Sequence, residues 1–273
     1  MEFWIRIIEA INTKTETPEM YGRFHLVCWA ITLLVAALLC LLYKKKCIKS
    51  VRRVLLVTAL LVIVFEILKL AAYSVEYDEG IIFRFNWKHF PWQVCSLPMY
   101  IGLLASMTRG KLHDALCCFL ATFAVFAGTA VMVYPGNVFV DIAVINIQTM
   151  ICHGSMLCIG IFLYYTNHVK AEFKTILKAT PVFVTCLGIA IAINEIGHNC
   201  GLNDVYEFDM FFISPYEKSI LPIYKHLQTI LPFWASALIY AAVFIMLSFL
   251  VLCVAMLLKR IIPGSRGKKK GAD

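Results

Sequence analysis

Seven stretches of apolar residues recur along the chain, and each is long enough, or nearly long enough, to cross a bilayer. A transmembrane helix needs roughly 20 apolar residues, because each residue adds ~1.5 Å along its axis. The stretches cover residues 24–43, 54–73, 91–108, 115–134, 142–165, 177–194 and 229–258. The third is short, and the last is long enough to tilt. The pattern predicts an all-α polytopic membrane helix bundle with about seven transmembrane helices.

The composition supports this prediction. Of the 273 residues, 61% are hydrophobic and 15% are charged, and the mean hydropathy is +0.79. A soluble domain is nearer half apolar and a quarter charged, so these values exclude a soluble enzyme and a disordered protein. In a soluble protein the net charge of +8 would suggest nucleic acid. In a membrane protein, basic residues in the loops instead determine how the helices are oriented in the bilayer. We therefore expect membrane lipids, and no nucleic acid, as partners.

Basic residues separate cleanly between alternate loops. The segments 44–53, 109–114 and 166–178 and the tail from Lys259 hold 17 of the 25 Lys and Arg residues. The N-terminal segment and the segments 74–90, 135–141 and 195–228 hold 7, together with 13 acidic residues. Because basic loops stay in the cytoplasm, we predict an outside N-terminus and a cytoplasmic C-terminus.

The sequence predicts a single transmembrane domain flanked by short terminal segments. We expect an external segment 1–23, a seven-helix bundle over 24–258 and a basic cytoplasmic tail over 259–273. The external segment is either an interfacial amphipathic helix or a partly ordered tail. The first span is followed by Lys44–Lys46, which favours a retained helix over a cleaved signal peptide. The predicted location is the cell membrane, as a multi-pass protein. No internal repeat of the kind found in transporters is visible.

Most of the 11 cysteines lie within or near the apolar spans, where a thiol behaves as a small hydrophobic group. Cys47, in the basic loop 44–53, is a weak candidate for palmitoylation. Cys200 lies in an outer loop without a cysteine in another outer loop to pair with, so we expect no structural disulfide. Cys95 differs from the others, because polar residues surround it in the sequence.

Polar side chains inside the spans are candidates for function, because lipid cannot solvate them. Counting from the helix ends places all of them between the outer surface and about the midplane of the bilayer. This predicts a polar cavity that opens toward the outer leaflet. Glu66 and Lys69 are three residues apart on one helical face and can pair. Each amide also has a simpler interpretation as a hydrogen bond between helices. The candidates are Glu66, Lys69, Gln93, Cys95, Asn146, Gln148, His153 and Asn194.

Cys95 and His153 together are the minimum for a thiol nucleophile. The histidine takes or shares the proton, and the thiolate attacks an acyl carbonyl. An amide or carboxylate commonly orients the histidine. The two residues differ by ~10 Å in estimated depth, which tilt of the short third span would have to close. Taken separately, Cys95 is interpreted as a packing residue. No pattern for a nucleotide, a metal or another cofactor is present, so we expect none.

The sequence resembles the YwaF-like integral membrane proteins, relatives of the transmembrane protein 164 cysteine acyltransferases. The resemblance covers about residues 85–250 and rests on Pro91-Trp92-Gln93-Val94-Cys95-Ser96-Leu97, Tyr134-Pro135, His153, Ile193-Asn194 and Ser214-Pro215. It implies a bundle of six or seven helices and transfer of an acyl chain between phospholipids through a thioester. Cys95 would be the nucleophile and His153 its base. Many relatives carry His where this chain has Gln93, which cannot act as a base.

Three classes of function remain open from the sequence. The leading hypothesis is a phospholipid acyltransferase or transacylase with a cysteine nucleophile in an outer-leaflet cavity. The second is a small-solute or proton-coupled transporter, in which Glu66, Lys69 and His153 would relay protons or bind an ion. The third is a non-enzymatic seven-span membrane protein such as a receptor.

Overall fold

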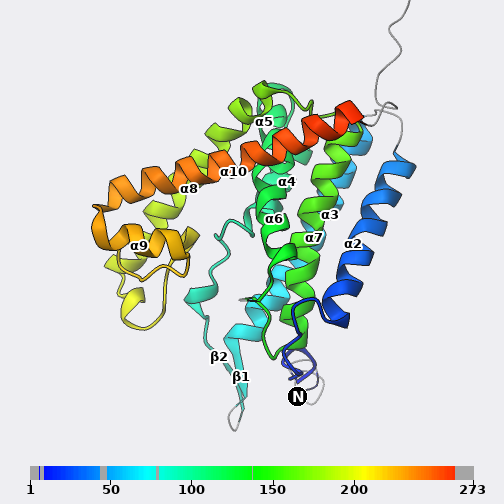
Figure 1. Cartoon of the computed structure of the whole chain (residues 1–273). Coiled ribbons are helices and arrows are strands. Elements are labelled where there is room, and N and C mark those ends of the chain that lie inside the picture. The colour runs from blue at the N-terminus through cyan, green and yellow to red at the C-terminus, as the bar shows by residue number, and fades with distance from the viewer. Residues whose placement is uncertain (1–5, 7–8, 44–47, 78–79, 137, 262–273) are drawn as a thin grey trace, which may run out of the picture.

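The computed structural model describes residues 6, 9–43, 48–77, 80–136 and 138–261. The predicted all-α membrane bundle is confirmed (Figure 1). Within the described residues, six helical segments are long and apolar enough to cross a membrane. They are α2 (Arg23–Leu42), α3 (Ile48–Ser74), the pair α5 (Gly110–Ala121) and α6 (Phe123–Val133), α7 (Ala143–Tyr165), α8 (Phe173–Asn199) and α10 (Phe233–Ile261).

The third predicted span is shorter than expected. Helix α4 covers only Leu97–Met107, which is about 16 Å and roughly half the thickness of a hydrocarbon core. Pro98 lies in its first turn, where a residue without an N–H is tolerated. An earlier start would place this proline inside the helix. Residues 91–96 are therefore irregular backbone, with one 3-10 turn, η1 (Trp87–His89), before them. The predicted count of seven corresponds to six long segments and one half-length helix.

The fourth predicted span is broken near its middle. Helices α5 and α6 meet at Thr122, whose backbone (φ −123°, ψ −77°) is not helical. The Thr122 hydroxyl donates to the Cys118 carbonyl at 2.7 Å. At the first residue of α5, Gly110 has a φ of +66°, a conformation that a residue without a Cβ adopts readily. This glycine lets the chain turn from α4 into α5 across two residues.

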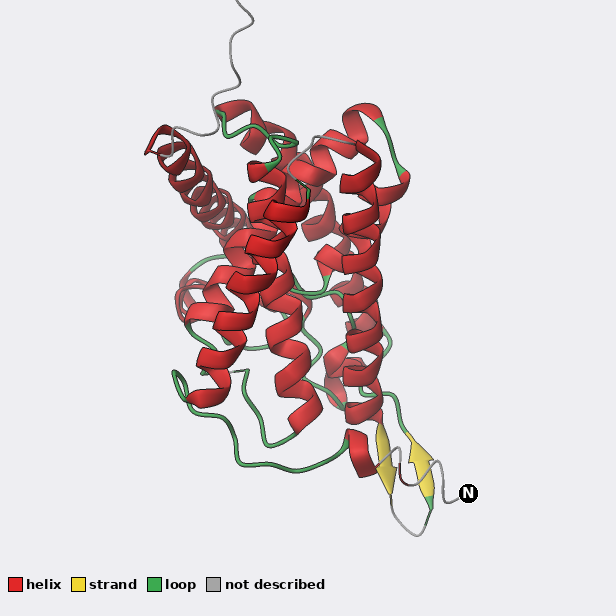
Figure 2. Cartoon of the chain, turned by 90° about the vertical axis from the view of Figure 1, so that its right-hand side faces the viewer, coloured by secondary structure: helices red, strands yellow, loops and turns green. Residues whose placement is uncertain are grey.

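The structure also contains features that apolar periodicity does not predict. Strands β1 (Val75–Tyr77) and β2 (Ile81–Phe83) form a two-stranded antiparallel hairpin after α3. Figure 2 shows this hairpin projecting beyond the helices. Near the N-terminus, Lys14 forms an isolated antiparallel bridge with Ile142. Residues 1–5 and 7–8, which carry most of the predicted amphipathic helix, and the tail 262–273 lie outside the described residues, as does Cys47.

The predicted outer loop 195–228 is more structured than expected. Helix α8 continues to Asn199, and the loop then forms the 3-10 turns η2 (Leu202–Asp204) and η3 (Met210–Phe212). Helix α9 (Pro222–Ile230) follows and leads into α10. Phe208, Met210 and Phe211 are fully buried. The loop is thus packed into the bundle, because its own apolar side chains provide the contact.

Small residues allow the central helices to approach closely. A Cβ added to Gly128 of α6 would lie 2.8 Å from the His153 carbonyl of α7, and one added to Gly154 would lie 2.6 Å from the Thr32 hydroxyl of α2. Such positions are common between membrane helices. Helix α7 is therefore the central element, and it contacts α2, α3, α5 and α6. Helices α8 and α10 lie at a slant to it (Figure 1).

Candidate functional site

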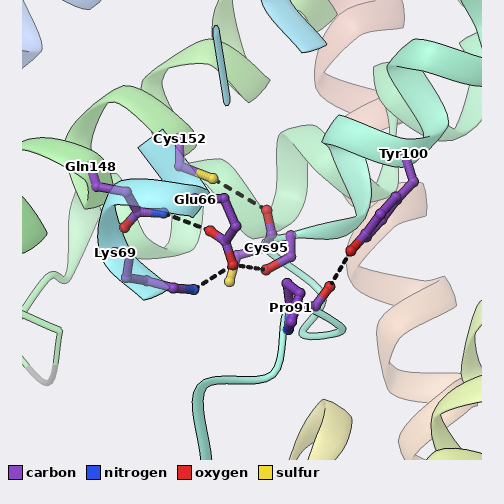
Figure 3. Close-up of polar contacts among 8 residues, drawn as sticks. Glu66, Lys69, Pro91, Cys95, Tyr100, Gln148 and Cys152 are labelled. Atoms are coloured by element: carbon purple, nitrogen blue, oxygen red, sulfur yellow. Dashed lines mark hydrogen bonds and ion pairs between the residues drawn. The ribbon is translucent and has the colours of Figure 1, made fainter. Parts of the chain in front are cut away.

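A buried carboxylate is the centre of the most polar cluster inside the bundle. Glu66 of α3 has a side chain that is 3% exposed. Its Oε1 accepts from the Lys69 ammonium at 2.5 Å and from the Ser96 hydroxyl at 3.2 Å. Its Oε2 accepts from the Gln148 amide of α7 at 3.0 Å. Figure 3 shows these groups converging from three segments of the chain. The predicted Glu66–Lys69 pair is therefore present, with Gln148 bound to it.

Cys95 lies beside this cluster, in the irregular segment that precedes α4. It is half-buried and carries a free thiol, and its neighbour Ser96 donates to Glu66. Figure 3 draws Cys95 next to the Glu66 and Lys69 side chains. The segment is fixed at its start, where the Tyr100 hydroxyl donates to the Pro91 carbonyl at 3.0 Å. A cation close to a thiol is typical of reactive cysteines.

Helix α7 contributes a second thiol to the same place. The Cys152 thiol donates to the Cys95 carbonyl at 3.3 Å, and it comes from the same face of α7 as Gln148, one turn away. Cys152 is almost fully buried. Cys152, the sequence neighbour of His153, is thus hydrogen-bonded to the Cys95 segment.

His153 has a different partner from the one its predicted role requires. Its Nδ1 donates to the Thr149 carbonyl at 2.7 Å, one turn back on α7. Among the described residues, no hydrogen bond joins His153 to the Cys95 thiol. The bond to Thr149 occupies Nδ1 as a donor, so Nε2 is the nitrogen left with a lone pair.

The three remaining predicted residues bind backbone groups. The Gln93 amide donates to the Asp209 carbonyl at 2.7 Å, and its oxygen accepts from the Phe211 N–H at 2.9 Å. Asn194 of α8 forms two such bonds with Met210, at 3.0 and 2.7 Å. Asn146 binds both the N–H and the carbonyl of Val140. Gln93 and Asn194 therefore anchor the η3 turn, and Asn146 closes the loop before α7.

Asp209, at the start of this turn, is a buried carboxyl outside the spanning segments. Its Oδ1 accepts from the Ser214 N–H at 2.7 Å. Burial raises the pKa of Asp209 to about 7, although the bonds from Ser214 and Ile213 act in the opposite direction. On the same side of the bundle, burial is the largest cause that lowers the pKa of His89 in η1 to about 4, and the charges of Lys69 and Lys88 act in the same direction.

Residues of α2, α3 and α7 line an apolar groove of about 600 Å³. Its lining is mostly apolar and includes Val27, Ile31, Val35, Leu61, Ile147 and Ile151, with Thr32, Thr58 and Ser155 among its polar residues. The groove shares Thr58 and Ser155 with a small cavity of about 20 Å³ that is lined by Pro98. A cavity of that size holds about one water molecule. The groove therefore approaches the segment of Cys95 but narrows before reaching it.

Sequence reasoning did not place Ser96 or Cys152 among the site residues. Ser96 was detectable as a hydroxyl next to Cys95, and Cys152 lies one turn from Gln148, on the same helical face. Asp209 gave less signal, because an acidic residue in a loop is normally solvated. Its burial follows from the packing of Phe208, Met210 and Phe211 around it.

The model of the TMEM164 family matches residues 20–261 of the chain. No curated protein and no solved structure matches it. The matched range includes every helix described above and all of the candidate residues.

Proposed function

The chain belongs to the TMEM164 family, and we propose that this integral membrane protein is an enzyme of the cell membrane that transfers an acyl chain between phospholipids through a thioester on Cys95. The observation that carries the proposal is the half-buried thiol beside the buried Glu66–Lys69 ion pair. Most other thiols of the described residues lie in apolar surroundings. Low dielectric disfavours a thiolate, and a fixed cation compensates for this.

The reaction has two steps that share one intermediate. In the first, the Cys95 sulfur attacks the ester carbonyl carbon of a donor phospholipid. A carbon–sulfur bond forms, the carbon–oxygen bond to glycerol breaks, and the thiol proton ends on the glycerol oxygen of the released lysolipid. In the second, the hydroxyl oxygen of an acceptor lysolipid attacks the thioester carbonyl carbon. A carbon–oxygen bond forms, the carbon–sulfur bond to Cys95 breaks, and the hydroxyl proton passes to the released sulfur. No cofactor is needed, because donor and acceptor bonds are equivalent esters.

Two residues qualify for the transfer of the thiol proton. His153 has Nδ1 bound to Thr149, so its Nε2 is free to accept a proton, but it has to approach Cys95 when substrate binds. Glu66 reaches the Cys95 segment through Ser96, but three donors already occupy its two oxygens. We assign the base to His153 and a positioning role to Glu66.

The apolar groove fits the acyl chain of the substrate. Its volume of about 600 Å³ is in the ordinary range for ligand sites, and its mostly apolar lining suits a hydrocarbon chain. The narrow cavity at Pro98 has to widen for the ester carbonyl to reach Cys95. A substrate that stays in the bilayer can enter this groove directly from the lipid.

Mass spectrometry of the protein purified from native-like lipid tests the proposal. We expect an acyl mass increase on the peptide that carries Cys95, and we expect hydroxylamine to remove it. Cys152 is the matched control, because its thiol is bonded to the Cys95 carbonyl and is not expected to acylate. His153→Ala should lower the occupancy of the adduct on Cys95. Acylation of both thiols to the same extent, or of neither, would contradict the proposal.

A second candidate function is proton-coupled transport, which the buried pair of Glu66 and Lys69 favours. Ionisable groups inside a membrane commonly mark proton pathways. In that case uptake of protons into vesicles should require Glu66 and should be unchanged by Cys95→Ser. An acyltransferase has the reverse dependence on Cys95.

A further inference from the structure

A second cluster of ligand-type side chains lies at the far end of α4 from Cys95. His113 and Cys117 are four residues apart on α5 and therefore share one helical face. His168 follows α7 and faces them. His113 Nε2 lies 2.7 Å from His168 Nε2 and 3.6 Å from the Cys117 sulfur. All three ligand atoms lie within 4.8 Å of one another.

The backbone fixes the position of His168. Its neighbour Asn167 has a φ of +52°, and the chain bends there so that the Val169 N–H donates to the Leu163 carbonyl at 3.1 Å. The Asn167 side chain accepts a hydrogen bond from the ammonium of Lys259 at the end of α10. Val169 is buried. His168 is thus held over α5 by contacts other than its own hydrogen bond to His113.

The orientation of His113 is also fixed. Its ring is buried, and Nδ1 donates to the Ala105 carbonyl of α4 at 2.7 Å. Metal-binding histidines usually donate their second nitrogen to a carbonyl or carboxylate in this way. The bond leaves Nε2 with its lone pair directed at His168 and Cys117.

We propose that His113, Cys117 and His168 bind a divalent transition metal ion, Zn²⁺ in the first place. Two imidazoles and one thiolate are a donor set that zinc accepts, with Zn–N distances of about 2.0–2.1 Å and a Zn–S distance of about 2.3 Å. Tetrahedral angles then place the two nitrogens about 3.4 Å apart and each nitrogen about 3.6 Å from sulfur. The observed distance of 3.6 Å from His113 Nε2 to the Cys117 sulfur matches this value. The Nε2 atoms of His113 and His168, now 2.7 Å apart, have to separate by about 0.7 Å.

The half-buried His168 can make this movement, because α5 holds the other two ligands. Binding of Zn²⁺ releases the Cys117 thiol proton to water. The proton that His168 Nε2 donates to His113 Nε2 has to move to His168 Nδ1 through solvent, which frees the Nε2 lone pair for the ion. The fourth coordination position is open to a water molecule. The ion would join α5 to the connection between α7 and α8. This site is independent of the acyl-transfer proposal, because α4 separates it from Cys95 by about 16 Å.

The test uses the full chain in lipid nanodiscs, purified without a histidine tag. Zinc is measured by elemental analysis after dialysis against a moderate chelator, and Co²⁺ serves as the spectroscopic probe. We expect about one zinc per chain and a thiolate-to-cobalt charge-transfer band. His168→Ala should lower zinc affinity by at least about 100-fold. Cys117→Ser should abolish the band.

Two matched variants control for adventitious binding. Cys118→Ser changes the next buried thiol on α5, and His226→Ala removes an exposed imidazole on α9. Both should keep the metal and the band. His168 is only half-buried, so we expect His168→Ala to fold even if Cys117→Ser does not. The zinc content of His168→Ala therefore tests the proposed site. Equal zinc retention in His168→Ala and wild type, or wild type that loses its zinc to the chelator, would overturn the site and leave a hydrogen-bonded histidine pair.

Discussion

The polar groups around Glu66 and those around the η3 turn look alike in the sequence but differ in what they bind. Around Glu66, four side chains from three segments bind one another, and two of them are ionisable. Around η3, Gln93 and Asn194 bind only backbone N–H and carbonyl groups. The first set therefore keeps groups that can gain or lose protons. The second set satisfies backbone groups that would otherwise be buried without partners.

This difference separates positioning of the chain from chemistry on a ligand. An amide bound at both its nitrogen and its oxygen, like Gln93, has few bonds left to offer a substrate. The proposed function therefore assigns the chemistry to Cys95 and the groups near Glu66, and Gln93 fixes the segment on which Cys95 lies.

The largest effect is expected from breaking the buried ion pair. Glu66→Ala or Lys69→Ala leaves one charge unpaired in the bundle, which should cost about 3–5 kcal/mol of stability. The double Ala variant should lose much less than the sum of the two. Thermal unfolding of the protein in nanodiscs measures each variant. The exposed pair of Lys14 and Asp141, whose side chains are 66% and 56% exposed, is the control, and its removal should change the stability little because solvent screens it. Strictly additive losses at Glu66 and Lys69 would show that the two do not interact.

A smaller effect is expected from the amides that hold the η3 turn. Gln93→Ala or Asn194→Ala leaves buried backbone groups without a partner and should cost about 1–3 kcal/mol each. Hydrogen exchange of residues 205–215 should rise in both variants. Asn199→Ala, which removes an exposed amide bond to Glu195, is the matched control. If Asn194→Ala left the η3 turn protected from exchange and slowed acylation of Cys95 instead, Asn194 would belong to the chemical site and not to the groups that hold this turn.

The smallest effect is expected from pH. The raised pKa of Asp209, about 7 in the fold, means that its contribution is complete below its unfolded pKa near 4 and is lost as pH rises through 7. The lowered pKa of His89, about 4, works in the opposite direction, because its contribution is complete above about 6.5 and is lost as pH falls through 4. The hydrogen-exchange protection of the η3 turn, corrected for the base-catalysed intrinsic exchange rate, should fall between pH 5 and 8 in wild type. Asp209→Asn should remove that dependence, and its persistence in this variant would exclude Asp209 as the cause.

The membrane bundle was predictable because apolar stretches of fixed length have few other folds. The span boundaries of α2 and α7 differ by at most one residue from those expected. The late start of the third span, at Leu97, was predictable in principle from Pro98, which is tolerated in the first turn of a helix but not in its interior. The hairpin after α3 and the packed loop 200–221 were missed, because hydropathy treats both simply as polar connections.

The candidate site was predictable only in part. Buried polar residues near the outer half of the spans gave Glu66, Lys69 and Gln148, which the structure brings together. The sequence could not assign partners, because rotation of α7 about its axis decides whether Cys152 or His153 faces Cys95. Contacts such as His113 with His168 join residues 55 positions apart and depend on tertiary packing. The predicted orientation, with the N-terminus outside, remains a prediction.

Acyl transfer in proteoliposomes tests the central claim most directly. Protein is reconstituted with a phospholipid that carries a labelled acyl chain and with an unlabelled lysophospholipid, and the labelled product is measured over time. Cys95→Ser should abolish the transfer, because a serine hydroxyl is a far weaker nucleophile than a thiolate. Cys152→Ser keeps a donor for the Cys95 carbonyl and should retain most of the wild-type rate. Equal rates for Cys95→Ser and Cys152→Ser, or no transfer by the wild-type protein with any phospholipid donor, would contradict the account.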